Sequence, residues 1–403
     1  MNKIKTGGRI IMKYDFDKVI DRRGTGAIKC QVAPRKFHCD AEDLLPLWIA
    51  DTDFEVAPEI VEAINKRCEH PLFGYTTAQP DYAPAVADFY NRRYNLGVDP
   101  KWILPSTCVM TAMCFAVLAV TEPEDKLMVM TPIYDPFYGV VANTGRVQVE
   151  CPLVRNDDTY TIDFDLMEQQ MKDGVKVLLF CNPHNPTGRV WTREEMDKIA
   201  GLCEKYGVAV HSDEVHGDMA MSGHPYISML EYKNLHENMV VYTSPAKTFN
   251  LAGMDISNLI IPNPELKNKV NQKLRSGFVK NPPLLSLTAT QAAYTYGDEW
   301  LDQAKAYIEA NSEYVLKFIS ENMPKIHPAK HEGTYLMWLD CSCFNKGDAL
   351  SQDIVDHCHV ALGAGGGYGA GYEQFQRLNI GTARANLEEA LNRILKYYKK
   401  CVQ

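Results

Sequence analysis

The sequence predicts an α/β fold, with a mostly parallel central sheet in a large domain and a smaller α+β domain after it. Short apolar runs alternate with helical patterns in the middle of the 403-residue chain, which is typical of parallel strands joined by right-handed crossovers. The C-terminal third changes to long amphipathic patterns with one short apolar run. The length itself favours more than one domain.

The central strands are predicted from apolar runs that are short and bounded by turn residues. These runs are 126–131, 175–181, 208–212, 240–244 and 258–262. A helix is expected over 191–206, because Thr192 and Glu195 form a capping box and Gly207 can end it. Residues 109–120 are apolar and suit a buried core helix better than a membrane span.

The remaining elements set the expected domain division. Amphipathic helices are predicted over 300–322 and 386–400, and a strand over 335–339. We predict an N-terminal segment that packs with the small domain, a large domain and a small C-terminal domain, over 13–48, 49–290 and 291–403.

Two stretches are harder to interpret. The glycine-rich run 363–371 fails the G-x-G-x-x-G spacing, because Tyr368 stands at the third position, so a mobile loop is expected there. The chain could also start at Met12 instead of Met1, which would make residues 1–11 an upstream extension.

Composition and charge exclude several classes of protein. The net charge is −9 and basic residues form no block, so nucleic-acid binding is not expected. No run predicts a membrane span, and no apolar segment follows the basic N-terminal residues as in a secretory signal. The 12 cysteines are scattered without a C-x-x-C pair, which predicts no metal site and suits a reducing cytoplasm.

One lysine stands in unusual surroundings. Lys247 follows the apolar run 240–244 closely and is the only charged residue between Val240 and Met254. Withheld from water, its ammonium group would have a lowered pKa and become a nucleophile towards carbonyl groups. A solvated surface lysine is the ordinary alternative, and this residue alone favours that alternative.

A proline-rich motif follows the run 175–181. Residues 182–188 read NPHNPTG, and their prolines and glycine predict a fixed turn from which Asn185 could present its amide. A plain turn between a strand and a helix is the alternative.

An acidic motif ends the run 208–212. Residues 211–216 read HSDEVH, which places Asp213 at the crevice where α/β proteins bind ligands. Helix capping by Ser212 or Asp213 is the alternative. A Ser-His-Asp triad is disfavoured, because no G-x-S-x-G turn supplies the serine.

Taken together, these motifs resemble the aminotransferase class I/II family of fold type I pyridoxal 5′-phosphate (PLP) enzymes. The resemblance runs from about residue 14 to the C-terminus. The segments PLWIADTDF, FGYT, TPIYDPF, NPHNPTG, DEVH, EGTYL and RLN look like the C–S lyase branch, which contains cystathionine β-lyases of the maltose-regulon-modulator type and cysteine-S-conjugate β-lyases. They lie at 46–54, 73–76, 131–137, 182–188, 213–216, 332–336 and 377–379.

The resemblance implies a fold type I PLP-transferase-like fold and a role for each matching residue. Lys247 forms the Schiff base with PLP and acts as general base. Arg377 forks onto the substrate α-carboxylate, and the main chain of Ala50 contacts the same carboxylate. Tyr75 acts in catalysis and reaches the cofactor phosphate of the neighbouring subunit, which implies a homodimer with shared active sites.

The other cofactor contacts are implied in the same way. The main chains of Val109 and Met110 bind the phosphate together with Ser244, and free N–H groups at a helix start suit that role. Tyr134 stacks on the pyridine ring, and Asp213 pairs with the ring nitrogen. Asn185 and His216 lie near the ring hydroxyl.

The activity that the resemblance implies is PLP-dependent C–S β-lysis. L-Cystathionine or a related cysteine S-conjugate would give pyruvate, ammonia and a thiol. The alternative is a PLP-dependent aminotransferase of unknown specificity. A catalytically idle regulatory protein is a third hypothesis, which intact Lys247, Asp213 and Arg377 disfavour. The leaving group stays open among cystathionine, cysteine, cystine and S-alkyl conjugates.

Overall fold

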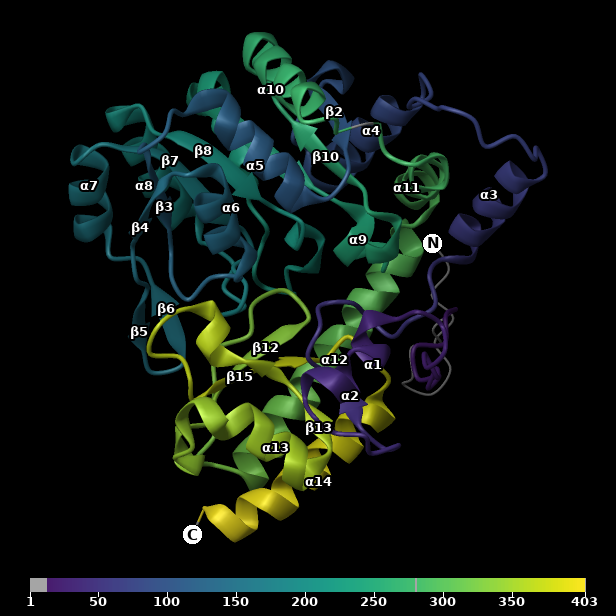
Figure 1. Ribbon diagram of the computed structural model, residues 1–403, viewed down its shortest axis with the longest axis vertical. Helices are drawn as coiled ribbons and strands as arrows, with labels where there is room; N and C mark the ends of the chain where they lie inside the picture. The colour runs from purple at the N-terminus through teal and green to yellow at the C-terminus, as the bar shows by residue number, and fades with distance from the viewer. Residues whose placement is uncertain (1–12, 280, 403) are drawn as a thin grey trace.

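The computed structural model describes residues 13–279 and 281–402, which form two regions, each built around one main sheet (Figure 1). Met1 and Met12, and hence the question of the start, lie outside the described residues. The N-terminal segment and residues 327–402 lie together in the lower part of Figure 1, and the middle of the chain forms the upper part.

A seven-stranded sheet forms the centre of the upper region. Its order is β2-β10-β9-β8-β7-β3-β4, and β10 runs antiparallel to both its neighbours while the other pairs are parallel. The strands are β2 (Ile103–Ser106), β3 (Lys126–Val129), β4 (Val147–Glu150), β7 (Val175–Cys181), β8 (Ala209–Asp213), β9 (Met239–Thr243) and β10 (Ser257–Ile260). The predicted α/β class with a mostly parallel sheet is confirmed, and all five predicted runs are strands of it.

Both faces of this sheet are buried, which explains why its strands are almost continuously apolar. Side chains alternate between two cores: Leu178 and Phe180 face one, and Val177 and Leu179 face the other. The second core is closed by α5 (Val109–Val120), α6 (Pro136–Thr144) and α10 (Pro264–Ser276).

The remaining helices of this region cover the first core or flank the sheet. They are α3 (Pro58–Cys68), α4 (Tyr82–Tyr94), α7 (Phe164–Lys172), α8 (Arg193–Tyr206), α9 (Pro245–Thr248) and α11 (Leu284–Tyr296), and the small hairpin of β5 (Val154–Asn156) and β6 (Thr159–Thr161) lies beside them. The capping box of α8 is present as predicted, with Thr192 and Glu195 exchanging hydrogen bonds. Gly207 ends that helix with a φ of 63°.

The lower region contains a four-stranded sheet in the order β11-β12-β15-β14. Its elements are β11 (His327–Pro328), β12 (Leu336–Asp340), β14 (Gly363–Ala364) and β15 (Phe375–Asn379), with α12 (Asp298–Asn322), α13 (Leu350–Cys358) and α14 (Arg384–Cys401) packed around them. The two predicted amphipathic helices correspond to α12 and α14.

The N-terminal segment adds short elements to this lower region. It forms α1 (Ile28–Gln31), α2 (Ala33–Lys36) and β1 (Leu45–Pro46), and β1 pairs in parallel with β13 (Val360–Ala361). The predicted boundary between residues 290 and 291 falls inside α11, so a division there would cut a continuous helix. The domain division stays a prediction.

The glycine-rich stretch is not the free loop expected from the sequence. Gly363 and Ala364 form β14, which pairs with Arg377 and Gln376 of β15. A Cβ on Gly365 would lie 2.0 Å from the carbonyl oxygen of Tyr372, so glycine is required for the backbones to approach. The stretch carries no nucleotide-binding motif, and Gly365 serves the close approach of two backbone segments.

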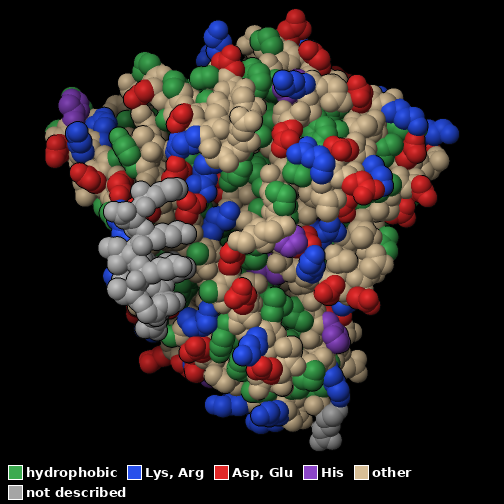
Figure 2. Space-filling model, turned by 180° about the vertical axis from the view of Figure 1, so that it is seen from behind, with side chains coloured by type: hydrophobic (Ala, Val, Ile, Leu, Met, Phe, Trp, Pro, Cys, Tyr) green, Lys and Arg blue, Asp and Glu red, His purple; other side chains and the backbone are tan. Residues whose placement is uncertain are grey.

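The surface mixes charges of both signs. On the face seen in Figure 2, basic and acidic side chains are interspersed among apolar and polar groups. None of the helices in residues 13–279 and 281–402 combines the length and apolarity needed to cross a bilayer.

Candidate functional site

The candidate site lies where several parallel strands end at one edge of the large sheet. In the register of the sheet, Cys181 of β7 stands opposite Asp213 of β8, and Asp213 stands opposite Tyr242 of β9. The residues that follow these strands therefore converge, as the crevice rule for open α/β sheets predicts. The motifs around Asn185, Asp213 and Lys247 come together for this reason.

Lys247 lies in the one-turn helix α9 directly after β9 and lines a cavity of about 700 Å³. Its Nζ donates a hydrogen bond of 2.7 Å to the carbonyl oxygen of Ala50. Burial, with a further contribution from the positive charge of Arg377, lowers the pKa of Lys247 to about 8. Lys247 therefore lines a cavity with a depressed pKa, which suits a nucleophile, and it is not a fully solvated surface lysine.

Asp213 ends β8 and is 5% exposed. Burial raises the pKa of this carboxyl to about 7, although the N–H of Val215 and the charge of Lys247 both lower it. Its neighbour Glu214 is satisfied by hydrogen bonds from Ser228 at 2.6 Å and from the Met229 N–H at 2.9 Å. The adjacent carboxylates therefore differ: Glu214 holds the fold together, and Asp213 is left for a cationic partner.

Arg377 joins the two sheets at the cavity. It lies on β15, and its guanidinium donates to Asn185 Oδ1 at 3.1 Å and to the carbonyl oxygen of Trp48 at 3.0 Å. Its Nε has no hydrogen-bond partner among the described residues, although the atom is buried. A buried guanidinium held by neutral acceptors, with a donor still free, suits an incoming carboxylate.

Two rings flank the site. Tyr134 lines the cavity, and its main-chain N–H donates to the carbonyl oxygen of Asn185 at 3.1 Å. His216 is buried with its Nδ1 unpartnered among the described residues, and its ring lies 5.6 Å from that of Tyr335. Burial keeps the pKa of His216 well below the ordinary histidine value, so its imidazole is neutral.

The predicted phosphate contacts lie at the start of α5. Val109 and Met110 are its first residues, and no side chain caps its N-terminus, so the first N–H groups remain available. The hydroxyl of Ser244 donates to the carbonyl oxygen of Ile256 at 2.6 Å and accepts from the Ala246 N–H at 3.1 Å. The phosphate role of Ser244 stays a prediction, because its proton is already engaged.

Tyr75 lies away from the Lys247 cavity. Its side chain is fully exposed and lines a different hollow, together with Phe73 and Phe278. Of the other predicted residues, Ala50, Tyr134, Lys247 and Arg377 line the cavity. Asn185 contacts the cavity residue Arg377 through its side-chain hydrogen bond. The charge of Lys247 lowers the pKa values of Asp213 and His216, so both lie within its electrostatic reach.

A buried ion cluster, which the sequence reasoning missed, fixes the segment that carries Ala50. Lys29 Nζ lies 2.9 Å from Asp53 and 3.4 Å from Asp51, with its side chain fully buried. Arg22 pairs with Asp51 at 2.7 Å and with Asp53 at 2.8 Å. Although burial raises it, the pKa of Asp53 is held below its usual value by Lys29 and Arg22. The only sequence signal was the spacing of two aspartates in residues 46–54.

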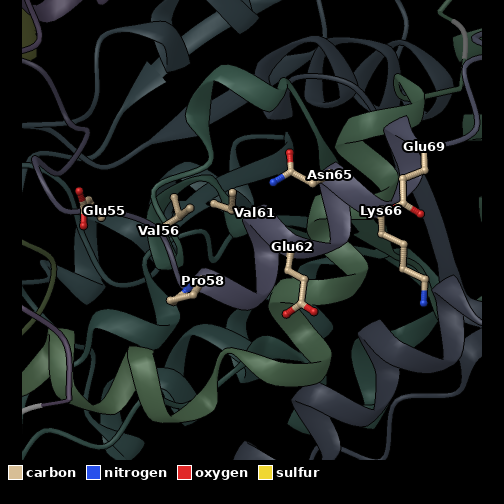
Figure 3. Close-up of a pocket in the computed structure, with 8 residues that line it drawn as sticks. All are labelled: Glu55, Val56, Pro58, Val61, Glu62, Asn65, Lys66 and Glu69. Atoms are coloured by element: carbon tan, nitrogen blue, oxygen red, sulfur yellow. The ribbon is translucent and has the colours of Figure 1, made fainter.

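A larger hollow lies away from this chemistry. It measures about 850 Å³ and runs along α3 (Figure 3). Its lining residues follow one another on α3 and the segment before it: Glu55, Val56, Pro58, Val61, Glu62, Asn65, Lys66 and Glu69. It shares no described residue with the Lys247 cavity and brings no nucleophile and base together, so its size does not make it the functional site.

The residues around Lys247 fit the PLP that the resemblance implies. A lysine with a depressed pKa can attack an aldehyde, and a buried carboxylate without a cation can hold a protonated pyridine nitrogen. The uncapped start of α5 suits a phosphate, and the orphaned Nδ1 of His216 offers a polar partner inside the site.

Comparisons with known proteins agree with this geometry. A family model described as "Aminotransferase class I and II" matches residues 42–394. Cystathionine beta-lyase PatB of Bacillus subtilis (strain 168) is 38% identical over 385 residues, which cover 94% of this chain and 98% of that protein. Protein MalY of Escherichia coli (strain K12) is 32% identical over 383 residues, which cover 94% and 97%.

A solved structure is similar over nearly all of both chains. The crystal structure of cystalysin from Treponema denticola, which contains a pyridoxal 5′-phosphate cofactor, superposes with a TM-score of 0.93 at 31% identity, covering 96% of this chain and 100% of that one. Given the family match over most of its length and relatives above 30% identity, the chain belongs to the aminotransferase class I and II family.

Proposed function

We propose that this protein is a PLP-dependent carbon–sulfur β-lyase that converts L-cystathionine or a related cysteine S-conjugate to pyruvate, ammonia and a thiol. The main support is that Lys247, whose pKa is lowered, and Arg377, whose buried Nε is unpartnered among the described residues and free to bind a carboxylate, line the same cavity. The relatives support the lyase reaction, because PatB is named a cystathionine beta-lyase.

When bound, PLP supplies an electron sink for the electrons of the substrate Cα–H bond. Lys247 takes the Cα proton as general base, and a pKa near 8 leaves a useful neutral fraction at physiological pH. The electrons released at Cα form the new double bond to Cβ as the Cβ–S bond breaks. The sulfur leaves as a thiolate, and hydrolysis of the remaining three-carbon unit gives pyruvate and ammonia.

Arg377 determines which way the substrate lies. Its contacts to Asn185 and Trp48 fix the plane of the guanidinium, and two parallel hydrogen bonds to a carboxylate then fix the α-carbon relative to Lys247. Asp213 holds positive charge on the ring nitrogen, because a buried carboxylate with no ion-pair partner among the described residues gains most from a cation.

We infer that the protein works as a homodimer with shared active sites. Leu72, Phe73, Tyr75 and Phe278 are large apolar side chains that are 60% exposed or more. Three of them line a hollow of about 810 Å³ together with residues 281–285. A concentrated exposed apolar patch of this kind marks a protein–protein contact. A second copy would bury it and bring Tyr75 towards the neighbouring cavity.

The cysteines support a reducing cytoplasm as the compartment. All 12 are free thiols, and Cys68 and Cys401 are exposed. Oxidising compartments select for paired cysteines in secreted proteins.

Product analysis tests the reaction. The purified PLP-loaded protein is incubated with L-cystathionine or L-cysteine without any α-keto acid. Pyruvate, ammonia and thiol in equal, catalytic amounts are expected. If pyruvate is absent, and an added α-keto acid instead yields a new amino acid, the protein is an aminotransferase and the proposal is wrong.

Subunit complementation tests the shared site. Lys247→Ala and Tyr75→Ala are each expected to be inactive. When subunits of the two variants are mixed and exchange at random, half of the dimers contain one subunit of each variant. Each such dimer has one intact site of two, so about a quarter of the wild-type activity should return. If Tyr75 served its own chain, every site of the mixed dimer would carry a defect and no activity would return.

A further inference from the structure

The charged side chains that line the Lys247 cavity divide into three pairs. Lys247 and Arg377 belong to the reaction, and Arg22 and Asp51 neutralise each other at 2.7 Å. Lys36 and Asp135 are left over. Neither has an ion-pair partner within the described part of the chain. The cavity therefore offers one unused positive group and one unused negative group.

Lys36 is held at the cavity by aromatic rings. It is the last residue of α2, and its Nζ lies 5.1 Å from the ring centroid of Trp48 and 5.8 Å from that of Phe37. Both rings line the same cavity. Attraction between an ammonium group and aromatic rings restricts the side chain without neutralising its charge. Trp48 also accepts the hydrogen bond from Arg377, so one residue connects both cations.

Asp135 stands on another wall of the cavity. It follows Tyr134 and precedes α6, and its carboxylate makes no helix-capping hydrogen bond. Partial burial raises the pKa of Asp135, whereas the charges of Arg377 and Lys36 lower it, which places both cations within electrostatic reach. Both Asp135 and Lys36 are exposed residues, so they lie towards solvent.

We propose that Lys36 and Asp135 recognise the distal amino-acid group of the substrate, with Lys36 binding its carboxylate and Asp135 its ammonium group. The substrate class is then a thioether with an α-amino acid at each end, as in L-cystathionine. This inference rests on the proposed function, since it concerns the part of the substrate that leaves with sulfur.

The chemistry of such a substrate matches the arrangement of charges. Its reacting end needs one guanidinium and one lysine, which Arg377 and Lys247 supply. Its distal end is a zwitterion, which one cation and one anion lining the same cavity can pair without leaving net charge. L-Cysteine and simple S-alkyl conjugates lack this distal group, so they would gain nothing from Lys36 and Asp135.

Binding of sulfur-free analogues tests the proposal independently of the reaction. Three probes share the same chain length: L,L-2,7-diaminooctanedioate has the full distal zwitterion, L-2-aminooctanedioate has only the distal carboxylate, and L-2-aminooctanoate has neither. None carries a leaving group, so dissociation constants of the holoenzyme can be measured by calorimetry even if the lyase reaction is disproved. Failure of this inference and failure of the proposed function are thus separate results.

The variants assign each charge. Lys36→Met keeps the side-chain length without the charge, and Asp135→Asn keeps the shape. Arg35→Met is the matched control, because Arg35 is the neighbouring exposed cation and lies outside the described cavity lining. The measured quantity is the preference ratio, which is the dissociation constant of L-2-aminooctanoate divided by that of each other probe.

The expected results differ for each variant. Lys36→Met should lower the preference ratio about tenfold, which is about 1.4 kcal/mol, for both probes that carry a distal carboxylate. Asp135→Asn should lower it only for L,L-2,7-diaminooctanedioate. Arg35→Met should leave both ratios as in the wild type. The proposal is overturned if the wild-type holoenzyme shows no preference, or if Lys36→Met changes the ratio no more than Arg35→Met.

Discussion

The rate at which the apoprotein captures PLP should depend on pH in a way that reports the environment of Lys247. Only a neutral amine attacks the aldehyde of PLP, so the capture rate follows the neutral fraction of the lysine. Burial, then the charge of Arg377, depresses the pKa of Lys247, while Asp51 and Asp213 oppose the depression. The rate should therefore rise with pH up to about pH 8 and then level off.

The size of the effect follows from the shift. The pKa of Lys247 is lowered from 10.5 to about 8. At pH 7 about a tenth of such a lysine is neutral, compared with about three in ten thousand for an ordinary lysine, since each pH unit is a factor of ten. Capture at pH 7 should consequently be about 300 times faster than an ordinary lysine would allow at equal access.

Stopped-flow absorbance measures this directly. Apoprotein is mixed with PLP between pH 6 and pH 10. Each capture rate is divided by the rate constant for neutral N-α-acetyl-lysine at the same pH. This division removes the effect of the titration of PLP itself. Arg377→Gln provides a matched perturbation. Because the charge of Arg377 lowers the pKa of Lys247, its removal should move the midpoint to higher pH.

A corrected rate that keeps rising tenfold per unit up to pH 10 would contradict a depressed pKa of Lys247. That profile would mean that the ammonium of Lys247 is fully solvated in the apoprotein. An unchanged midpoint in Arg377→Gln would leave burial as the cause but exclude the contribution of the neighbouring charge.

Three further predictions concern the surroundings of the cavity. Lys29→Met should lower the free energy of unfolding in urea by about 3 kcal/mol, because it leaves Asp53 and Asp51 with Arg22 as their only cation among the described residues. The control Lys198→Met removes an exposed ion pair and should change that free energy by less than about 0.5 kcal/mol. Equal effects of the two substitutions would contradict a stabilising role of the buried cluster. Gly365→Ala should cost about 1–3 kcal/mol of stability and raise KM, because its Cβ would meet the Tyr372 carbonyl, and Gly367→Ala, whose Cβ meets nothing within 4 Å, is the control. Asp213→Asn should still bind PLP but lose about 10²–10³ in kcat, as removal of an electrostatic stabiliser does; an unchanged kcat would show that the ring nitrogen needs no carboxylate.

The local elements of the fold follow closely from the sequence. The apolar run 175–181 became β7 with the predicted bounds, and 109–120 became α5. Such predictions succeed because a strand buried on both faces must be almost continuously apolar. A capping side chain such as Thr192 likewise marks the start of α8 in the sequence. The prediction of a mobile loop over 363–371 was wrong, because glycine occurs both in flexible loops and at close backbone contacts. Only the neighbouring strand β15 distinguishes the two cases.

By itself, the sequence determined the order of the strands along the chain and which polar residues follow them, and its motifs carried the family resemblance. The tertiary structure decided which of these residues share one cavity and in which charge state. Lys247 alone favoured a surface interpretation, since its pKa depends on burial and on Arg377, which is 130 positions away in the chain. The pairing of Lys29 and Arg22 with Asp51 and Asp53 was likewise beyond the sequence, as was the lack of ion-pair partners for Lys36 and Asp135 within residues 13–279 and 281–402. Electrostatic energy depends on distances and on the exclusion of water, and both arise only when distant segments pack together.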